Sequence, residues 1–138
     1  MAQRLGRAAG PHGPYLGGLT ASSEAQLAGL LGLDPDLLAR SVPADATVAA
    51  AMAAAYRERF HADYGLAVGG FPETPPDSSQ PRPVHFAMAM PGGGACSLQI
   101  PFAAHPDLLP VYCAKHALNM ARLAMLREDE RGGDQRAE

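Results

Sequence analysis

Two adjacent serines, Ser22 and Ser23, follow the Gly17-Gly18 pair and are the hydroxyl groups of this chain best placed for chemistry. A serine hydroxyl is a weak nucleophile unless an adjacent base takes its proton. No Lys, Tyr or His lies where the sequence would let it activate either serine. We therefore expect Ser22 and Ser23 to contact a ligand or to cap a helix, and we predict no catalytic residue.

The cysteine and histidine side chains show no spacing typical of a metal site or a redox motif. Cys96 and Cys113 lie in apolar segments, and neither a Cys-x-x-Cys motif nor an HxxxH or HxH spacing occurs. His116 follows Cys113 by three residues, so a Cys–His hydrolase is one alternative. A cysteine on an apolar helical face is usually an inert core residue. We predict two reduced core thiols, no metal site and no cofactor.

Helix caps define three helices in the first half of the chain. Ser23 followed by Gln26 has the spacing of a capping box, and Gly32 marks the end of that helix. Asp34-Pro35 starts a second helix that ends near Arg40. Asp45 starts a third over residues 46–60, whose large apolar side chains recur every four residues beside a smooth alanine flank: Val48, Met52, Tyr56 and Phe60.

The second half predicts three strands and a long helix. YGLAVGG, residues 64–70, reads as a buried strand that ends at a glycine pair, and residues 71–83 are too rich in proline for regular structure. HFAMAM and CSLQIPF flank the glycines 92–94 as a hairpin of undefined register. Pro106 starts a helix to Arg127, with an apolar face formed by Leu109, Cys113, Ala117, Met120 and Ala124.

Length and composition limit the class of protein. The 138 residues suit one domain, 47% of them are apolar, and the net charge of −3 comes without a basic stripe for phosphates. The N-terminus has no apolar leader region, and the longest run free of charge and proline, residues 47–56, cannot span a bilayer. We expect a cytoplasmic protein with no nucleic acid or membrane as its partner.

Two segments resemble the C-terminal domain of the CinA family, whose members hydrolyse nicotinamide mononucleotide to nicotinate mononucleotide and ammonia. LLGLDPDLLARSVPADATVAAAMA is similar to the family's LLGV…LL…GAVS…VA…MA stretch, and RERFHADYGLAVGG is similar to its R…F.AD.GLAVTG segment. The resemblance covers most of the chain. It implies an α/β fold in a single CinA-like domain, with a small mixed sheet packed by helices.

The resemblance also implies that several catalytic groups have changed. The family's YSNEAK segment is ASSEAQ here, so Ala21 and Gln26 replace the Tyr and Lys expected to activate the serine. The family's Thr after GLAV is Gly69. Two loops differ as well: the glycine-rich IAGP segment is Phe71-Pro72-Glu73-Thr74, and the phosphate-facing Gly-Asp-Arg is Ala103-Ala104-His105.

Three functions remain as hypotheses. The first is a non-catalytic family member, a pseudoenzyme with a binding or oligomerisation role. Ser22, Ser23, Gly69 and Gly70 would then bind a pyridine nucleotide or a small anion weakly through exposed backbone N–H groups around the glycines. The second is an active amidohydrolase whose nucleophilic serine, in an ESCTGG motif, lies upstream of the first residue. The third is a plain dimerisation module.

The expected organisation is an irregular lead-in over residues 1–22, the CinA-like α/β domain over residues 23–127, and a disordered tail over residues 128–138. We expect a homodimer. Family domains associate, and an exposed strand edge or apolar helix flank is unfavourable in water.

Overall fold

The computed structural model describes residues 5–6, 14–21, 23–40, 45–69, 83–102 and 105–134. It contains one three-stranded sheet in the order β1-β2-β3, formed by Gly65–Val68, Pro83–Ala89 and Ala95–Pro101. Both strand pairs are antiparallel, so the described sheet is not the mixed sheet that we expected. The predicted α/β class, with one small sheet packed by helices, is confirmed.

The three predicted helices of the first half are present: α2 (Glu24–Leu31), α3 (Pro35–Arg40) and α4 (Ala46–Arg59). Their caps explain where they begin and end. Ser23 Oγ accepts from the Gln26 amide at 3.2 Å, and Gly32 ends α2 with a φ of 66°. Asp34 Oδ1 accepts from the Asp36 amide at 2.9 Å at the start of α3. In the described part of the predicted lead-in, residues 5–6 are helical, and residues 14–21 contain no helix or strand.

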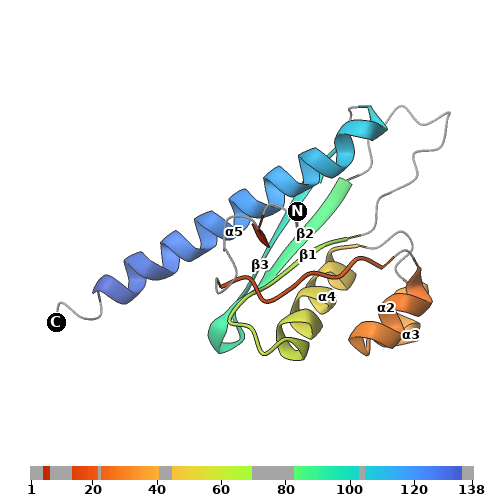
Figure 1. The fold of residues 1–138 in the computed structure, drawn as a ribbon, viewed down its shortest axis with the longest axis horizontal. Helices are drawn as coiled ribbons and strands as arrows, with labels where there is room; N and C mark the ends of the chain where they lie inside the picture. Colours follow the sequence, from red (N-terminus) through yellow and green to blue (C-terminus); the bar gives the residue numbers. More distant parts are fainter. Residues whose placement is uncertain are drawn as a thin grey trace.

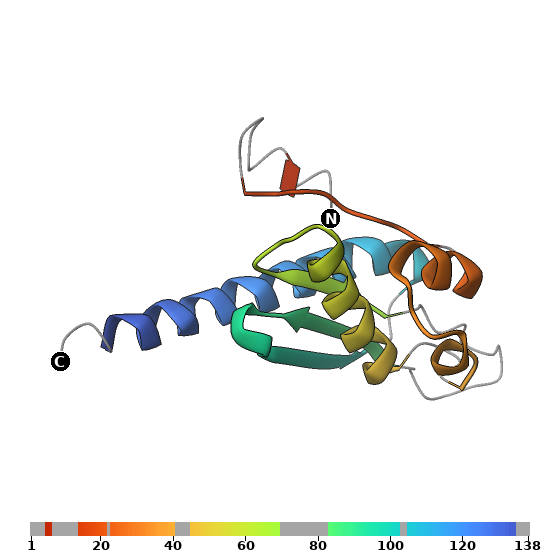
Figure 2. The same cartoon turned by 90° about the horizontal axis from the view of Figure 1, so that it is seen from below.

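The sheet lies between α4 and α5 (Leu109–Asp134), as Figure 1 shows from one side and Figure 2 from below. Alternate side chains of β2 point to opposite faces. Val84, Phe86 and Met88 pack with α5, whereas Ala87 and Ala89 pack with α4. The short 3-10 helix η1 (Pro91–Gly93) closes the β2–β3 hairpin, and η2 (Pro106–Leu108) leads into α5.

Helix α4 packs against the rest of the protein on two faces, whereas the sequence predicted one apolar stripe. Val48 and Met52 pack with Leu33 and Leu38, so the first half of the stripe of large side chains contacts the α2–α3 region. Tyr56 and Phe60, in the second half, stack on each other. The face against the sheet is made of alanine: Ala49 and Ala53 are 0% and 1% exposed and contact Ala67, Ala87 and Ala89. The small side chains of the alanine flank therefore let α4 pack closely on the sheet.

The last helix continues further than the sequence predicts. Its buried residues include Cys113, Ala117, Met120 and Ala124 from the expected apolar face. However, α5 runs to Asp134 rather than ending at Arg127, so the part of the predicted tail up to Asp134 is helical. Glu128 Oε2 accepts a hydrogen bond from Tyr64 Oη, just before β1, and this contact holds the helix against the sheet beyond Arg127.

Candidate functional site

Ser23, the first of the predicted ligand contacts, serves the structure as the N-cap of α2. Its exposed hydroxyl accepts from the Gln26 amide, which satisfies one of the free donors at the start of the helix. Ala21 and Gln26, the neighbours in the ASSEAQ segment, carry no group that could take a proton from a serine. Ser22 and Gly70 lie outside the described residues, as do the altered loop positions 71–74 and 103–104.

Gly69 directly follows β1 and is buried. Its amide donates to the His85 carbonyl at 2.6 Å, which continues the β1–β2 ladder by one residue. We expected an exposed backbone donor at this position. The sheet uses this N–H instead, so Gly69 cannot offer it to an anion.

The amino end of α4 lies at the same end of the sheet as Gly69, because Ala49 near the start of the helix packs with Ala67 near the end of β1. The start of a helix attracts anions when its amides are free. Here Asp45 Oδ1 accepts from the Thr47 and Val48 amides at 2.8 and 3.0 Å. The Asp45 carboxylate therefore occupies the position that an anion would take.

His85 is the residue beside Gly69 that the sequence analysis did not single out. The β2 alternation places its side chain on the α4 face, and its Nδ1 atom is buried without a hydrogen-bond partner in the described chain. Tyr56 Oη on α4 is in the same condition. Buried polar atoms normally have partners, so each of these two atoms is unusual. They lie in different places: His85 is on the α4 face of β2, whereas Tyr56 belongs to the stripe of large side chains and stacks on Phe60. The sequence did contain one indication of this residue, because His85 is the polar residue at the start of the otherwise apolar HFAMAM strand.

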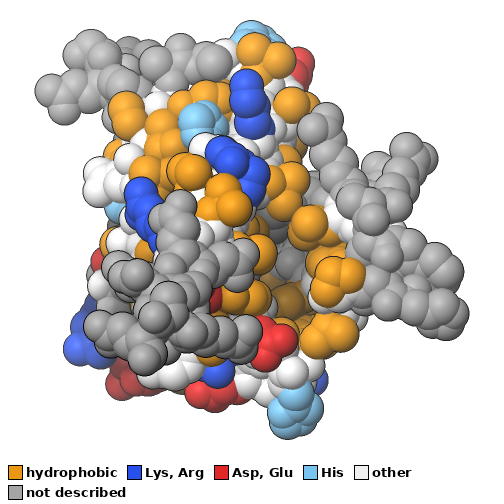
Figure 3. Space-filling model, turned by 90° about the vertical axis from the view of Figure 1, so that its left-hand side faces the viewer, with side chains coloured by type: hydrophobic (Ala, Val, Ile, Leu, Met, Phe, Trp, Pro, Cys, Tyr) orange, Lys and Arg blue, Asp and Glu red, His pale blue; other side chains and the backbone are white. Residues whose placement is uncertain are grey.

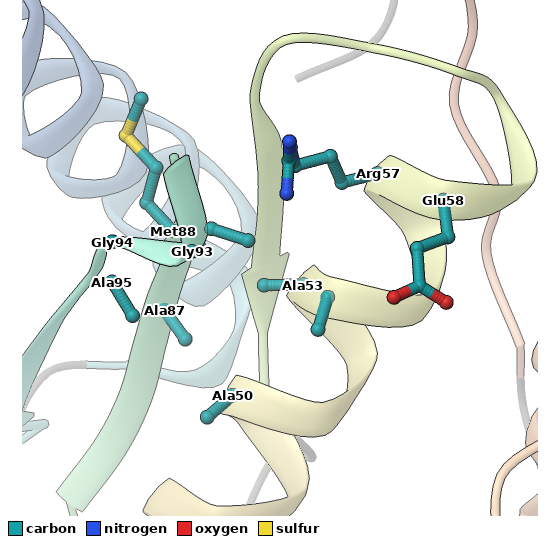
Figure 4. A pocket seen from close by; sticks show the side chains of 11 residues that line it. Ala50, Ala53, Arg57, Glu58, Ala87, Met88, Gly93, Gly94 and Ala95 are labelled. Atoms are coloured by element: carbon teal, nitrogen blue, oxygen red, sulfur yellow. The ribbon is translucent and has the colours of Figure 1, made fainter. Parts of the chain in front are cut away.

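The shallow pocket shown in Figure 4 lies between α4 and the β2–β3 hairpin, and its volume is about 190 Å³. Arg57 and Glu58 reach it from the last turn of α4, over a floor that is largely alanine. Arg57 Nε also donates to the Asp63 carbonyl at 3.1 Å. Neither Ser23 nor Gly69, the two predicted ligand contacts that the structure describes, lines this pocket.

Both thiols have a raised pKa because burial penalises the thiolate, and at Cys96 the positive charge of Arg127 only partly opposes that effect. A raised pKa leaves less thiolate, which is the nucleophilic form. Cys113 is the buried core thiol that we predicted, whereas Cys96 is only partly buried at the edge of that core, so the prediction holds for one of the two cysteines. His116 contacts the rings of Phe86 and Tyr112, with centroid distances of 6.4 and 4.2 Å.

We predict that Cys113, which is 4% exposed, will alkylate with iodoacetamide at pH 8 far more slowly than free cysteine, and that Cys96 will react at an intermediate rate. Burial limits access, and the raised pKa lowers the thiolate fraction at this pH. Mass spectrometry of a time course measures both rates, and the protein in urea is the control in which both thiols should react freely. Equal rates for native Cys113 and free cysteine would contradict this prediction.

The described residues contain no group of three or more His, Cys, Asp or Glu side chains arranged to hold a metal ion. None of the described helices combines the length and the apolar character that crossing a bilayer requires. Within the described residues, Ser23 serves as a helix cap, and burial raises the pKa of both cysteine thiols, so none of these three groups is an activated nucleophile.

The fold of this chain is similar to that of solved CinA superfamily proteins, which places it in a class of small α/β domains. The protein from Enterobacter cloacae aligns with a TM-score of 0.65 at 25% identity, over 75% of this chain and 62% of its own. The Escherichia coli protein ECK1530/EC0983 aligns with a TM-score of 0.62 at 26% identity, over 75% and 60%. The competence or damage-inducible protein of Enterobacter asburiae, at 24% identity and a TM-score of 0.67 over 78% and 68%, supports the fold alone.

The sequence then gives the family. The CinA C-terminal domain matches residues 1–125, and the chain belongs to this family. It is 30% identical over 133 residues to a CinA-like protein of Myxococcus xanthus, covering 91% of this chain and 30% of that relative. It is 35% identical over 94 residues to a CinA-like protein of Frankia casuarinae, covering 67% and 22%. The chain thus spans less than a third of either relative.

Proposed function

We propose that this CinA-family chain is a binding and assembly unit that does not itself hydrolyse an amide. The observation that carries the proposal is the state of Ser23, whose hydroxyl caps α2 and whose neighbours Ala21 and Gln26 cannot act as bases. Hydrolysis needs a nucleophile, a proton acceptor and donors for the developing oxyanion, and loss of each typically costs about 10²–10⁴ in rate.

The proposed ligand is a pyridine nucleotide, bound weakly through Ser22, Ser23 and the backbone around Gly70. This part of the proposal comes from the family resemblance and no longer relies on the Gly69 amide, which the β1–β2 ladder uses. Isothermal titration of the protein with nicotinamide mononucleotide measures this binding.

We also propose that the unit assembles as a homodimer and acts in the cytoplasm. Free Cys96 and Cys113 thiols suit a reducing compartment, where disulfides are rare. Exposed leucines on β3 and α5, among them Leu98 at 36% and Leu123 at 39%, suit a second protein surface.

The chain should release ammonia from nicotinamide mononucleotide at no more than the background rate. The assay compares the purified parent with a Ser22→Ala/Ser23→Ala variant, and both should give the same signal. Turnover of about one per second that the double variant abolishes would show that the chain is an amidohydrolase, and would overturn the non-catalytic proposal.

A further inference from the structure

The outer edge of β3 is open in the described structure. The sheet ends at β3, and Figure 2 shows no described element beyond it. Native sheets usually protect such an edge with charged side chains, proline or a bulge. The seven residues of β3, ACSLQIP, include no charge, and their one proline is the last residue. This edge is therefore free to pair with another strand.

Two backbone hydrogen bonds at the ends of β2 establish which groups of β3 face outward. Met90 N donates to the Gly94 carbonyl, so even-numbered residues of β2 bond to β3, while Gly69 N bonds to His85 on the β1 side. In an antiparallel ladder each residue directs both of its groups to one side, and successive residues alternate. Leu98, which is opposite Phe86, thus faces inward with its backbone. Ala95, Ser97 and Gln99 present their free N–H and C=O groups to the outer edge.

These free groups are complementary to a second copy of the same strand. Antiparallel pairing about a two-fold axis at Leu98, the middle residue of β3, places Ser97 opposite Gln99 of the second copy and Ala95 opposite Pro101. Ser97 and Gln99 would exchange both backbone hydrogen bonds in each half of the pair. Ala95 would donate to the Pro101 carbonyl, and proline has no N–H to leave unpaired.

The side chains agree with this register. Cys96, Leu98 and Ile100 lie on the α5 face of the sheet, where Leu98 is 36% exposed. Pairing sets Leu98 against Leu98 of the second copy and Cys96 against Ile100, while the other face pairs Ser97 with Gln99. Apolar meets apolar and polar meets polar, and no like charges oppose one another.

Helix α5 supplies an apolar flank to the same edge. Tyr112 packs edge-on against Phe102, just after β3, with ring centroids 5.4 Å apart. His116 and Leu123 follow Tyr112 by four and eleven residues, about one and three helical turns, so they share that side of α5. Leu123 is 39% exposed there. Figure 3 views the side of the molecule to which the hairpin and the far half of α5 point, and shows hydrophobic side chains gathered across it.

We infer that two copies of this chain pair through β3, antiparallel about a two-fold axis at Leu98, and so form one continuous six-stranded sheet. This inference deepens the assembly part of the proposed function and rests on it. We assign the edge to a second copy because β3 is complementary to itself under the two-fold rotation about Leu98. This holds for its outward backbone groups, for its lack of charge, and for its alternation of apolar and polar side chains.

Disulfide trapping tests the register directly. In a Cys96→Ser/Cys113→Ser background, Leu98→Cys should form an intermolecular disulfide under mild oxidation. Residues opposite each other at a non-hydrogen-bonded position have Cα atoms about 4.5 Å apart, which is within the range of a disulfide. Ser97→Cys in the same background is the matched control. Its two copies would lie about 8 Å apart, beyond disulfide reach, and should stay unlinked on a non-reducing gel.

A charge at the two-fold axis tests the energetics. Leu98→Asp places two carboxylates opposite each other and should raise the dimer dissociation constant about tenfold or more in sedimentation equilibrium. Met125→Asp is the control and should leave the constant unchanged. Met125 is 39% exposed, and its position in the helical repeat puts it on the other flank of α5 from Tyr112 and Leu123. Circular dichroism checks that both variants fold.

The outcomes of these experiments distinguish failure of the β3 interface from failure of the dimer itself. A parent that sediments as a monomer at high micromolar concentration overturns the dimer and this surface together. A dimeric parent whose Leu98→Cys form stays unlinked, or which is dissociated by Met125→Asp and not by Leu98→Asp, overturns the β3 surface and leaves the dimer intact.

Discussion

Replacing Phe86 with alanine should lower the free energy of unfolding by about 3–5 kcal/mol. The side chain is 1% exposed at the centre of the sheet, where it packs with Ala117, Met120 and other α5 residues. Alanine removes that buried surface and leaves a cavity that the surrounding helix and sheet can fill only in part. Urea unfolding followed by circular dichroism measures the loss.

Leu126→Ala is the control for size, because Leu126 is 46% exposed on α5 and its truncation should change stability by no more than about 0.5 kcal/mol. If Phe86→Ala loses its native baseline, Phe86→Leu should still fold with a smaller loss. A Phe86→Ala variant as stable as the Leu126→Ala variant would mean that Phe86 does not occupy the core between β2 and α5.

Gly65→Ala should cost at least about 3 kcal/mol, near the upper end of what overpacking a core usually costs. A Cβ atom at Gly65 would lie 2.9 Å from Arg57 Cβ, and closer still to the Ala53 carbonyl oxygen. The oxygen belongs to the α4 backbone and cannot rotate away as a side chain can. The helix would have to move off the sheet, and the alanine contacts along it would open.

Gly29→Ala is the matched substitution. Gly29 lies inside α2, and a Cβ atom there would have no heavy atom within 4 Å. Alanine should therefore stabilise the protein by about 0.5–1 kcal/mol through its higher helix propensity. Opposite signs for the two glycines in thermal or urea unfolding would confirm the close approach of α4 to β1. A Gly65→Ala variant that matches the parent would contradict it.

The helices of the first half could be predicted because their limits depend on local chemistry. Ser23, Asp34 and Asp45 accept hydrogen bonds from amides two or three residues ahead, and Gly32 adopts a left-handed turn that other residues avoid. Such interactions involve residues close in sequence. Their signal is therefore present in the sequence itself.

Contacts between distant segments were harder to predict. The stripe from Val48 to Phe60 is the stronger periodic signal on α4, yet the sheet packs against the alanine face, because only small side chains allow β1 to approach closely. The Tyr64 contact with Glu128 joins residues 64 positions apart. Nothing near Arg127 in the sequence could indicate that the helix continues to Asp134.

The candidate site was predicted less well than the fold. The resemblance led to Gly69, but the sheet register decides that its amide bonds to His85, and the sequence leaves that register undefined. The same register also decides that the His85 side chain lies on the α4 face of the sheet. The spacing of the histidines along the sequence could not indicate this position, because it depends on the pairing of strands. The resemblance to the CinA family was the most informative part of the sequence, and the family match over residues 1–125 confirms it.

Strand β2 belongs to both apolar layers, since its even-numbered residues pack with α5 and its odd-numbered ones with α4. Neither layer can therefore lose its contacts with β2 without exposing part of the other. A domain built in this way has no half that is stable alone, which favours cooperative unfolding in one transition. The β1–β2 pairing joins segments on either side of residues 69–82, whereas β2 and β3 are neighbours in one hairpin. We therefore expect the pairing of β2 with β1, rather than the formation of the hairpin, to limit the rate of folding.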